Sequence, residues 1–130
     1  MKYLLDTCAF IWMITSDEEK LSKRAKEIFI NLENELYVSI ISRFEISIKR
    51  NICKLVELEK ETEYYFENIR KLQGIRMLPL QGEDIDIMEK LPLLHKDPFD
   101  RIIISKAINN GLTIISNDDI FKQYPVKTIW

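Results

Sequence analysis

Several residue types are scarce in this chain, and each scarcity excludes a class of protein. Its 130 residues include 2 cysteines, 1 histidine, 3 glycines and 4 prolines. Two cysteines do not make the disulfide framework of a small secreted domain, and one histidine cannot build a zinc cage. No apolar run approaches membrane-spanning length, and Asp6 interrupts the apolar run nearest the start, so no signal peptide is recognised. We therefore expect a cytoplasmic protein without membrane contact.

A strong excess of either charge is also absent. The chain has 21 acidic and 19 basic residues, a formal net charge of −2 and a pI near 5.5, so no global basic surface points to nucleic acid. Two local basic clusters occur: Lys20, Lys23, Arg24 and Lys26, and then Arg43, Lys49, Arg50 and Lys54. Most such clusters are solvated helix faces. Phosphate would have to be neutralised by a few local cations and a metal ion.

What the chain does contain is enough apolar material for one folded domain. With 46% hydrophobic residues over 130 positions, we expect a single domain spanning residues 1–130 with a real core. Apolar strands are predicted at 2–5, 36–40, 75–78, 113–115 and 126–129. Helical patterns separate them, and this alternation is typical of an α/β fold. It predicts a mostly parallel sheet of four to five strands, covered by helices on both faces.

Helix boundaries can be placed by their capping residues. Ser22 is expected to cap an amphipathic helix, and Gly74 is expected to end a charged one. Asp97 followed by Pro98 predicts the start of a further helix, because Asp caps well and proline suits the first helical position. Gly111 is expected to end that helix.

Four acidic residues stand where strands pass into helices or on the apolar stripe of a helix. Asp6 follows the first strand, and Asp118 follows the strand at 113–115. Asp100 lies one turn into its helix. Glu45 shares the face of a helix over 42–50 with Ile41, Ile48 and Ile52, which predicts a partly buried carboxylate. Because parallel strands end at one edge of a sheet, we expect the four acids to gather there.

Each of these acids also has an ordinary structural explanation. Asp6 is a good helix cap, and a turn or cap role fits Asp118. Glu45 can pair with Lys49 one helical turn away, and Asp100 suits the positive end of a helix dipole. Together, however, crowded carboxylates without a cation would raise one another's pKa values.

We therefore interpret the four acids as a metal site. Carboxylate ligands without His or Cys partners favour Mg²⁺ or Mn²⁺ over zinc. Magnesium commonly binds through one or two carboxylates, waters and substrate phosphates, so the expected substrate is a phosphate ester. Metal-assisted phosphodiester hydrolysis is the expected chemistry. Thr7, His95 and Arg101 are candidate substrate contacts beside the acids.

Four segments taken in order resemble one known family. They are Leu4-Leu5-Asp6-Thr7 with Trp12, the helix from Ser42 to Lys49, Leu91-Pro92 with His95 to Arg101, and Gly111 leading to Ser116-Asn117-Asp118 and Phe121. Together they resemble a PIN domain, specifically the VapC-type toxin ribonucleases of toxin-antitoxin pairs. The resemblance implies a three-layer α/β/α fold, Mg²⁺- or Mn²⁺-dependent cleavage of RNA, inhibition by a cognate antitoxin, and homodimerisation. It assigns catalysis and metal binding to Asp6, Glu45, Asp100 and Asp118.

Two departures from the family pattern matter. Cys8 stands where this subgroup often has histidine, which puts a substrate contact by that position in doubt. Asp119 adjoins Asp118, although the spacing to Phe121 favours Asp118 as the fourth acid.

Three alternative functions are kept open. They are an RNA-processing or structure-specific PIN nuclease, a receiver-like or phosphatase-like module phosphorylated on Asp6, and an inactive PIN-like module that binds RNA. The second fits poorly, because such folds need paired acids around the first strand. The third would be expected to have lost some of the four acids.

Overall fold

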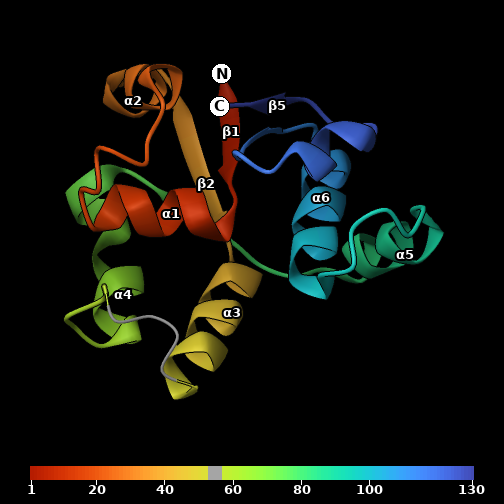
Figure 1. Ribbon diagram of the computed structural model, residues 1–130, viewed down its shortest axis with the longest axis horizontal. Helices are drawn as coiled ribbons and strands as arrows, with labels where there is room; N and C mark the ends of the chain where they lie inside the picture. Colours follow the sequence, from red (N-terminus) through yellow and green to blue (C-terminus); the bar gives the residue numbers. More distant parts are fainter. Residues whose placement is uncertain (53–56) are drawn as a thin grey trace.

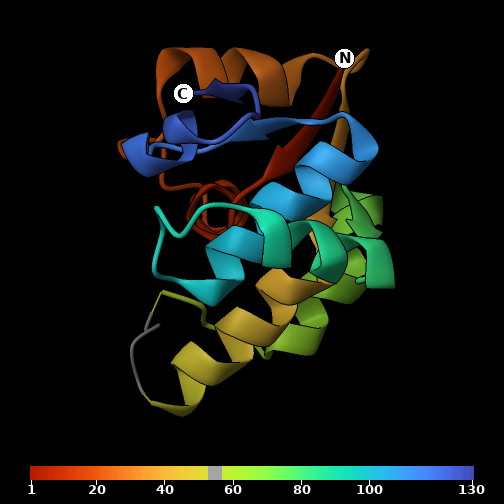
Figure 2. The same ribbon diagram turned by 90° about the vertical axis from the view of Figure 1, so that its right-hand side faces the viewer.

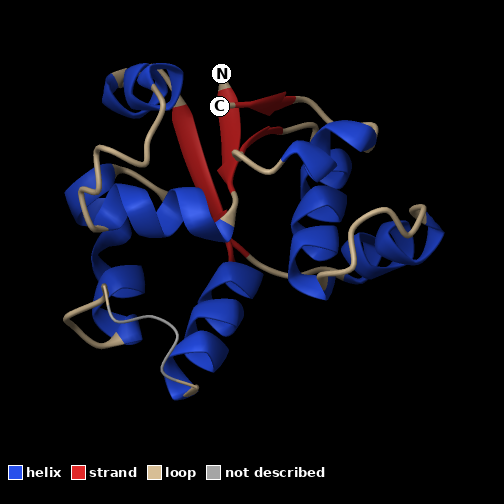
Figure 3. Ribbon diagram, in the orientation of Figure 1, coloured by secondary structure: helices blue, strands red, loops and turns tan. Residues whose placement is uncertain are grey.

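Strands and helices alternate along the chain in the computed structural model, which describes residues 1–52 and 57–130. The strands are β1 (Lys2–Leu5), β2 (Glu35–Ser39), β3 (Arg76–Leu78), β4 (Thr113–Ile115) and β5 (Thr128–Ile129) (Figure 3). The helices are α1 (Thr7–Ile14), α2 (Lys23–Ile30), α3 (Ile40–Asn51), α4 (Thr62–Gln73), α5 (Gly82–Lys90) and α6 (Pro98–Asn110), with a 3-10 helix η1 (Asp119–Gln123). The predicted α/β fold with five strands is confirmed.

All five strands run parallel in the order β3-β2-β1-β4-β5. Side chains of β1 alternate between the two faces of this sheet. Tyr3 and Leu5 pack in one core cluster with residues of α1, α2, α3 and α4, whereas Leu4 packs in a second cluster with α6 and η1. Figure 1 shows α1, α2 and α4 on one side of the strands and α5 and α6 on the other, and Figure 2 shows α5 and α6 from their own side. The result is the three-layer α/β/α arrangement.

The predicted caps are present where the sequence placed them. The Ser22 hydroxyl accepts from the Ala25 N–H at the start of α2. Asp97 caps α6 by accepting from the Phe99 N–H, 2.9 Å away, with Pro98 as the first helical residue. Gly111 ends α6 in the left-handed conformation at φ 63°, where glycine has no steric penalty. None of the helices in the described residues is long and apolar enough to cross a membrane.

The buried face of α3 differs from the sequence expectation. Ser42, Glu45 and Ile46 face inward, whereas Ile48 and Ile52 of the expected apolar stripe are exposed. Both views of the molecule show α3 extending beyond the end of β2, so its last turns have no sheet to pack against (Figures 1 and 2). Glu45 lies on the inward face with Ser42 and Ile46, and it is buried more completely than the partly buried carboxylate that the sequence predicted. Cys53 and Lys54, which the sequence placed after this helix, lie outside the described residues.

A buried ion pair joins α5 to α6. Lys106 Nζ lies 2.9 Å from Asp84 Oδ2, and both side chains are almost fully buried. Asn109 donates to the other carboxylate oxygen at 2.8 Å, and the Gln81 N–H donates to Oδ2. Burial alone would raise the pKa of Asp84, but hydrogen bonds from Asn109, Lys106 and Gln81 hold it below its usual value. The pair thus fixes α5 against the helix that carries Asp100.

We predict that Lys106→Met will destabilise the fold strongly. Removal of the ammonium leaves the Asp84 carboxylate buried without a counter-charge, which typically costs about 3–5 kcal/mol. Urea unfolding followed by circular dichroism measures the loss. The control is Lys122→Met, which breaks an exposed pair with Asp119 and should leave the free energy of unfolding nearly unchanged. Equal effects of the two substitutions would contradict a structural role for the buried pair.

Candidate active site

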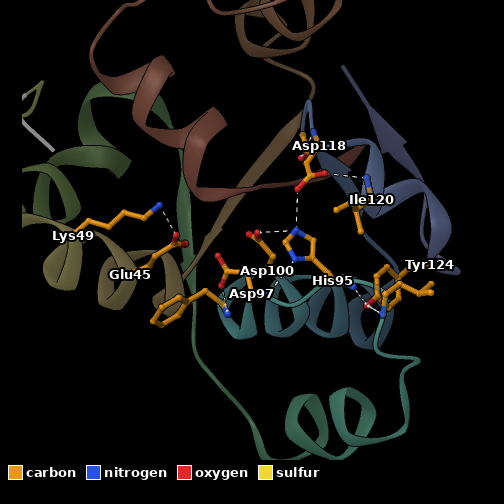
Figure 4. A network of polar contacts seen from close by, with 11 residues as sticks. Glu45, Lys49, His95, Asp97, Asp100, Asp118, Ile120 and Tyr124 are labelled. Atoms are coloured by element: carbon orange, nitrogen blue, oxygen red, sulfur yellow. Dashed lines mark hydrogen bonds and ion pairs between the residues drawn. The ribbon is translucent and has the colours of Figure 1, made fainter. Parts of the chain in front are cut away.

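The four predicted acids lie at the carboxyl edge of the sheet, the edge at which the parallel strands end, and are near enough to influence one another's pKa values. Figure 4 shows three of them, Glu45, Asp100 and Asp118. Asp6 follows β1 and caps α1, its Oδ1 accepting from the Ala9 N–H at 2.7 Å. Asp118 follows β4 and caps η1, its Oδ1 accepting from the Ile120 N–H at 2.9 Å. Each of these residues can therefore cap a helix and also bind a ligand, because capping uses only one of its two carboxylate oxygens.

Asp100 and Asp118 meet at a single histidine nitrogen. His95 Nε2 lies 3.1 Å from Asp100 Oδ2 and 2.9 Å from Asp118 Oδ2. One potential ligand atom from each of these three residues lies within 4.8 Å of the others, and the described residues contain no second group of this kind. Asp119 instead pairs with Lys122 at the surface. The structure thus brings Asp118, and not Asp119, into the cluster.

Glu45 approaches from α3 with a counter-ion of its own. It is 3% exposed, and Lys49 Nζ lies 2.7 Å from its Oε2. Its Oε1 is buried and has no hydrogen-bond partner within residues 1–52 and 57–130. The expected burial and the ordinary i,i+4 pair are both present. A buried carboxylate oxygen without a donor is costly, and a cation in the site would satisfy it.

Burial and crowding raise two of the carboxyl pKa values. Burial is the largest cause for Asp6, whose pKa rises to about 6; hydrogen bonds from Ser116 and Ala9 oppose the rise, and Glu45 and Asp118 add to it. Burial also leads for Asp100, whose pKa rises to about 7, with the negative charges of Asp97 and Glu45 next and His95 opposing. The repulsion expected from the sequence is present, although loss of water contributes more.

The three candidate substrate contacts lie in different settings. The Thr7 hydroxyl is buried and donates to Ser42 Oγ at 3.0 Å, which ties α1 to α3. Arg101 Nη2 donates to the carbonyls of Met88 and Leu91, at 3.0 and 3.1 Å, and so holds the end of α5. Only His95 points into the acidic cluster. Substrate contact by Thr7 and Arg101 stays a prediction. The hydrogen bonds that both side chains make within the protein do not favour it.

Sequence reasoning missed two residues that shape the site, Ser116 and Tyr124. Lys49 was predicted as the i,i+4 partner of Glu45, and the structure places that pair at the site. Ser116, directly after β4, accepts from the Asp118 N–H at 3.1 Å, and its hydroxyl lowers the pKa of Asp6. Tyr124 holds the loop before α6 through its hydroxyl, and no sequence pattern connects it with His95. Cys8, by contrast, is an exposed thiol in the first turn of α1, with no disulfide partner among the described residues.

Solved structures share this fold over nearly their whole length. VapBC2 from Rickettsia felis, bound to a DNA fragment from its promoter, gives a TM-score of 0.68 at 18% identity, over 99% of this chain and 98% of that chain. FitAcB from Neisseria gonorrhoeae gives 0.64 at 18% identity, over 98% and 96%. VapBC-5 from Mycobacterium tuberculosis, of the VapBC family of toxin-antitoxin systems, gives 0.63 at 14% identity, over 98% and 97%. At such identities the similarity establishes the fold.

Sequence comparison gives the family directly. No curated protein matches the chain in sequence. The PIN domain pattern, however, matches residues 3–127. This range includes all four predicted acids, β1 apart from its first residue, and the whole of β2, β3 and β4, whereas β5 follows it. The chain belongs to the PIN domain family.

Proposed function

We propose that this protein is a Mg²⁺- or Mn²⁺-dependent endoribonuclease of the VapC type, the toxin of a toxin-antitoxin pair. The proposal depends above all on one observation: Glu45 Oε1 is buried in a cluster of carboxylates and has no hydrogen-bond partner among the residues that the structure describes. A buried oxygen without a hydrogen-bond partner destabilises the fold, and a bound cation at a catalytic site would explain why it is present.

The residues present fit a divalent cation. Asp6 and Asp100 have raised pKa values, so a nearby positive charge would favour their ionised forms. The available donors are carboxylate oxygens, which suit Mg²⁺ and Mn²⁺ better than softer ions. Asp6 and Asp100 would hold the ion mainly, with Glu45 and Asp118 binding directly or through water.

The chain's own residues then account for substrate handling. A bound divalent ion supplies activation of water and neutralisation of phosphate charge. Glu45 and Asp118 enter from opposite flanks of Asp100, one from α3 and the other from the end of β4 (Figure 4). Lys49, with a side chain one-third exposed, adds a positive charge beside Glu45 that an RNA phosphate can approach.

The toxin role is supported by the solved structures that share this fold. FitAcB aside, the neighbours named above are described as VapBC proteins, and one of them as a toxin-antitoxin system. By analogy, we propose that the present chain binds a cognate antitoxin and forms a homodimer. Three apolar side chains at α3 are exposed, Phe44 and Ile48 within the helix and Ile52 at its C-cap, which is consistent with surface that a partner covers.

We predict that the purified chain cleaves single-stranded or loop RNA only with Mg²⁺ or Mn²⁺. Asp118→Asn keeps the cap on η1 but removes a ligand charge, and should reduce cleavage by at least ~10²-fold. Asp119→Asn is the matched control: the same change one residue away, outside the cluster, should leave cleavage near the parental rate. Gel-based cleavage assays with and without EDTA measure both. Full activity in excess EDTA would exclude the metal mechanism, and equal losses in the two variants would mean that the fourth acid is misassigned.

We also predict that Asp100→Asn is at least as stable as the parent in metal-free buffer at pH 7. The folded pKa of Asp100 is raised from 3.8 to about 7, so the folded state binds more protons than the unfolded state between these values. The parent therefore loses stability as pH rises from about 4 to about 7, by about 1.4 kcal/mol per unit of pKa shift, and the variant lacks this loss.

Thermal melts from pH 4 to 8, with EDTA or with Mg²⁺, test this prediction. The stability difference in favour of the variant should grow with pH in EDTA. Mg²⁺ should then stabilise the parent more, because an ion that binds the folded state raises its stability by mass action. If the variant melts well below the parent in EDTA and gains as much from Mg²⁺, Asp100 serves the helix start and not the metal.

Finally, we predict that expression of the chain slows bacterial growth and that a small partner relieves this. The partner should insert a cationic or aromatic segment near the acidic cluster, where carboxylates lack sufficient counter-charge. Growth curves with parent and Asp118→Asn, each with and without the partner, give the measurement. Harmless expression in several hosts, combined with intact cleavage of RNA in vitro, would favour an RNA-processing nuclease instead.

A further inference from the structure

His95 has a different hydrogen-bond partner on each of its ring nitrogens. The backbone N–H of Asp97 donates to Nδ1 at 3.1 Å, while Nε2 faces Asp100 and Asp118. A ring nitrogen that accepts a hydrogen bond carries no proton, so the proton of the imidazole lies on Nε2. Both carboxylates are acceptors, which agrees with an N–H directed at them.

This arrangement is incompatible with metal binding through Nε2. A ligand nitrogen needs a free lone pair, and the proton would then have to move to Nδ1. There it would face the N–H of Asp97, and the hydrogen bond between them would be lost.

The main chain of His95 is held just as firmly. Tyr124 is 4% exposed, and its hydroxyl accepts from the N–H groups of Leu94 and His95, at 3.1 and 2.8 Å. The same hydroxyl donates to the Pro92 carbonyl at 2.8 Å. One side chain thus makes three hydrogen bonds to the loop before α6. The His95 ring also packs edge-on against Phe121, with centroids 5.7 Å apart.

The two residues that hold His95 from its C-terminal side, Asp118 and Tyr124, lie at the two ends of η1. Asp118 caps the start of η1 and contacts the ring of His95, and Tyr124 caps its end and holds the backbone of His95. Figure 4 shows His95 between these two residues, with Asp100 beside its ring. η1 therefore fixes the position of the loop before α6, and a shift of either end of η1 would move His95 relative to the acids.

From this geometry we propose that His95 is a positioning residue and not a metal ligand: an Nε2–H donor, fixed by Asp97 and Tyr124, that sets the placement of the Asp100 and Asp118 carboxylates. This deepens the proposed function, on which it rests for the metal site itself. Carboxylate ligands are commonly oriented by such donors, and loss of the donor typically reduces metal affinity about 10- to 100-fold.

The single histidine allows a direct test of the tautomer. In the full chain labelled with ¹⁵N-histidine, ring correlation spectra show one imidazole. We expect Nε2 to be protonated and Nδ1 unprotonated, both without metal and with saturating Mg²⁺. Transfer of the proton to Nδ1 on addition of Mg²⁺ would show that His95 is a ligand and would overturn the proposal.

Mn²⁺ affinity, measured by titration calorimetry without RNA, tests the positioning role. His95→Ala should weaken binding about 10- to 100-fold, and His95→Gln, which keeps an N–H donor, should recover part of the loss. Tyr124→Phe should also weaken binding, although it touches no acid. Tyr65→Phe is its matched control, because the Tyr65 hydroxyl also accepts a backbone N–H, from Lys60 beside α4, and should bind Mn²⁺ as the parent does.

The outcomes separate this inference from the proposed function. Parental Mn²⁺ affinity in folded His95→Ala and Tyr124→Phe would overturn the positioning role, even if RNA is cleaved. If His95→Ala fails to fold, Tyr124→Phe and the histidine spectra still decide. The expected affinities in a chain that cleaves no RNA would overturn the ribonuclease and leave the inference standing. A parent that binds no Mn²⁺ would overturn both.

Discussion

The burial of negative charge at the carboxyl edge of the sheet is the constraint on which the site depends. Parallel strands place the turn after β1 and the turn after β4 next to each other, because these strands are direct neighbours in the sheet. Glu45 enters the same space from the helix that follows β2, and Asp100 from the start of α6. The fold thus concentrates carboxylates where water is scarce. Each nearby donor, Lys49, Ser116 and His95, compensates for part of that cost.

The layers behind the site resist the repulsion between its carboxylates. β1 lies at the centre of the sheet, with Leu5 in one core cluster and Leu4 in the other. α6 is fixed from its outer side by the Asp84–Lys106 pair and by Arg101, which holds the end of α5. Strain from crowded charge is therefore resisted by packing on both sides, which is how stored unfavourable interactions persist at functional sites.

Local patterns in the sequence predicted much of this, and tertiary contacts set the rest. Strand β1, the cap at Asp97 and the left-handed end at Gly111 follow from nearest neighbours, and the structure has each where expected. The prediction of the buried face of α3 was wrong. The side on which a helix packs depends on where the sheet ends, and residue spacing within the helix does not contain that information. The contact between His95 and Tyr124 joins residues 29 apart through a hydroxyl, and periodicity does not carry such information.

The capping roles of Asp6 and Asp118 affect how the family's acids should be read in related chains. Each closes the first turn of a helix with one oxygen, so a relative that had lost all catalysis would still be favoured to retain Asp or Asn there. Glu45 has no capping role, because it lies within α3, and the described part of the chain supplies no donor to its buried Oε1. Drift in an inactive lineage should remove it early. The presence of an acid at this one position is therefore a better marker of retained chemistry than the two aspartates at the strand ends.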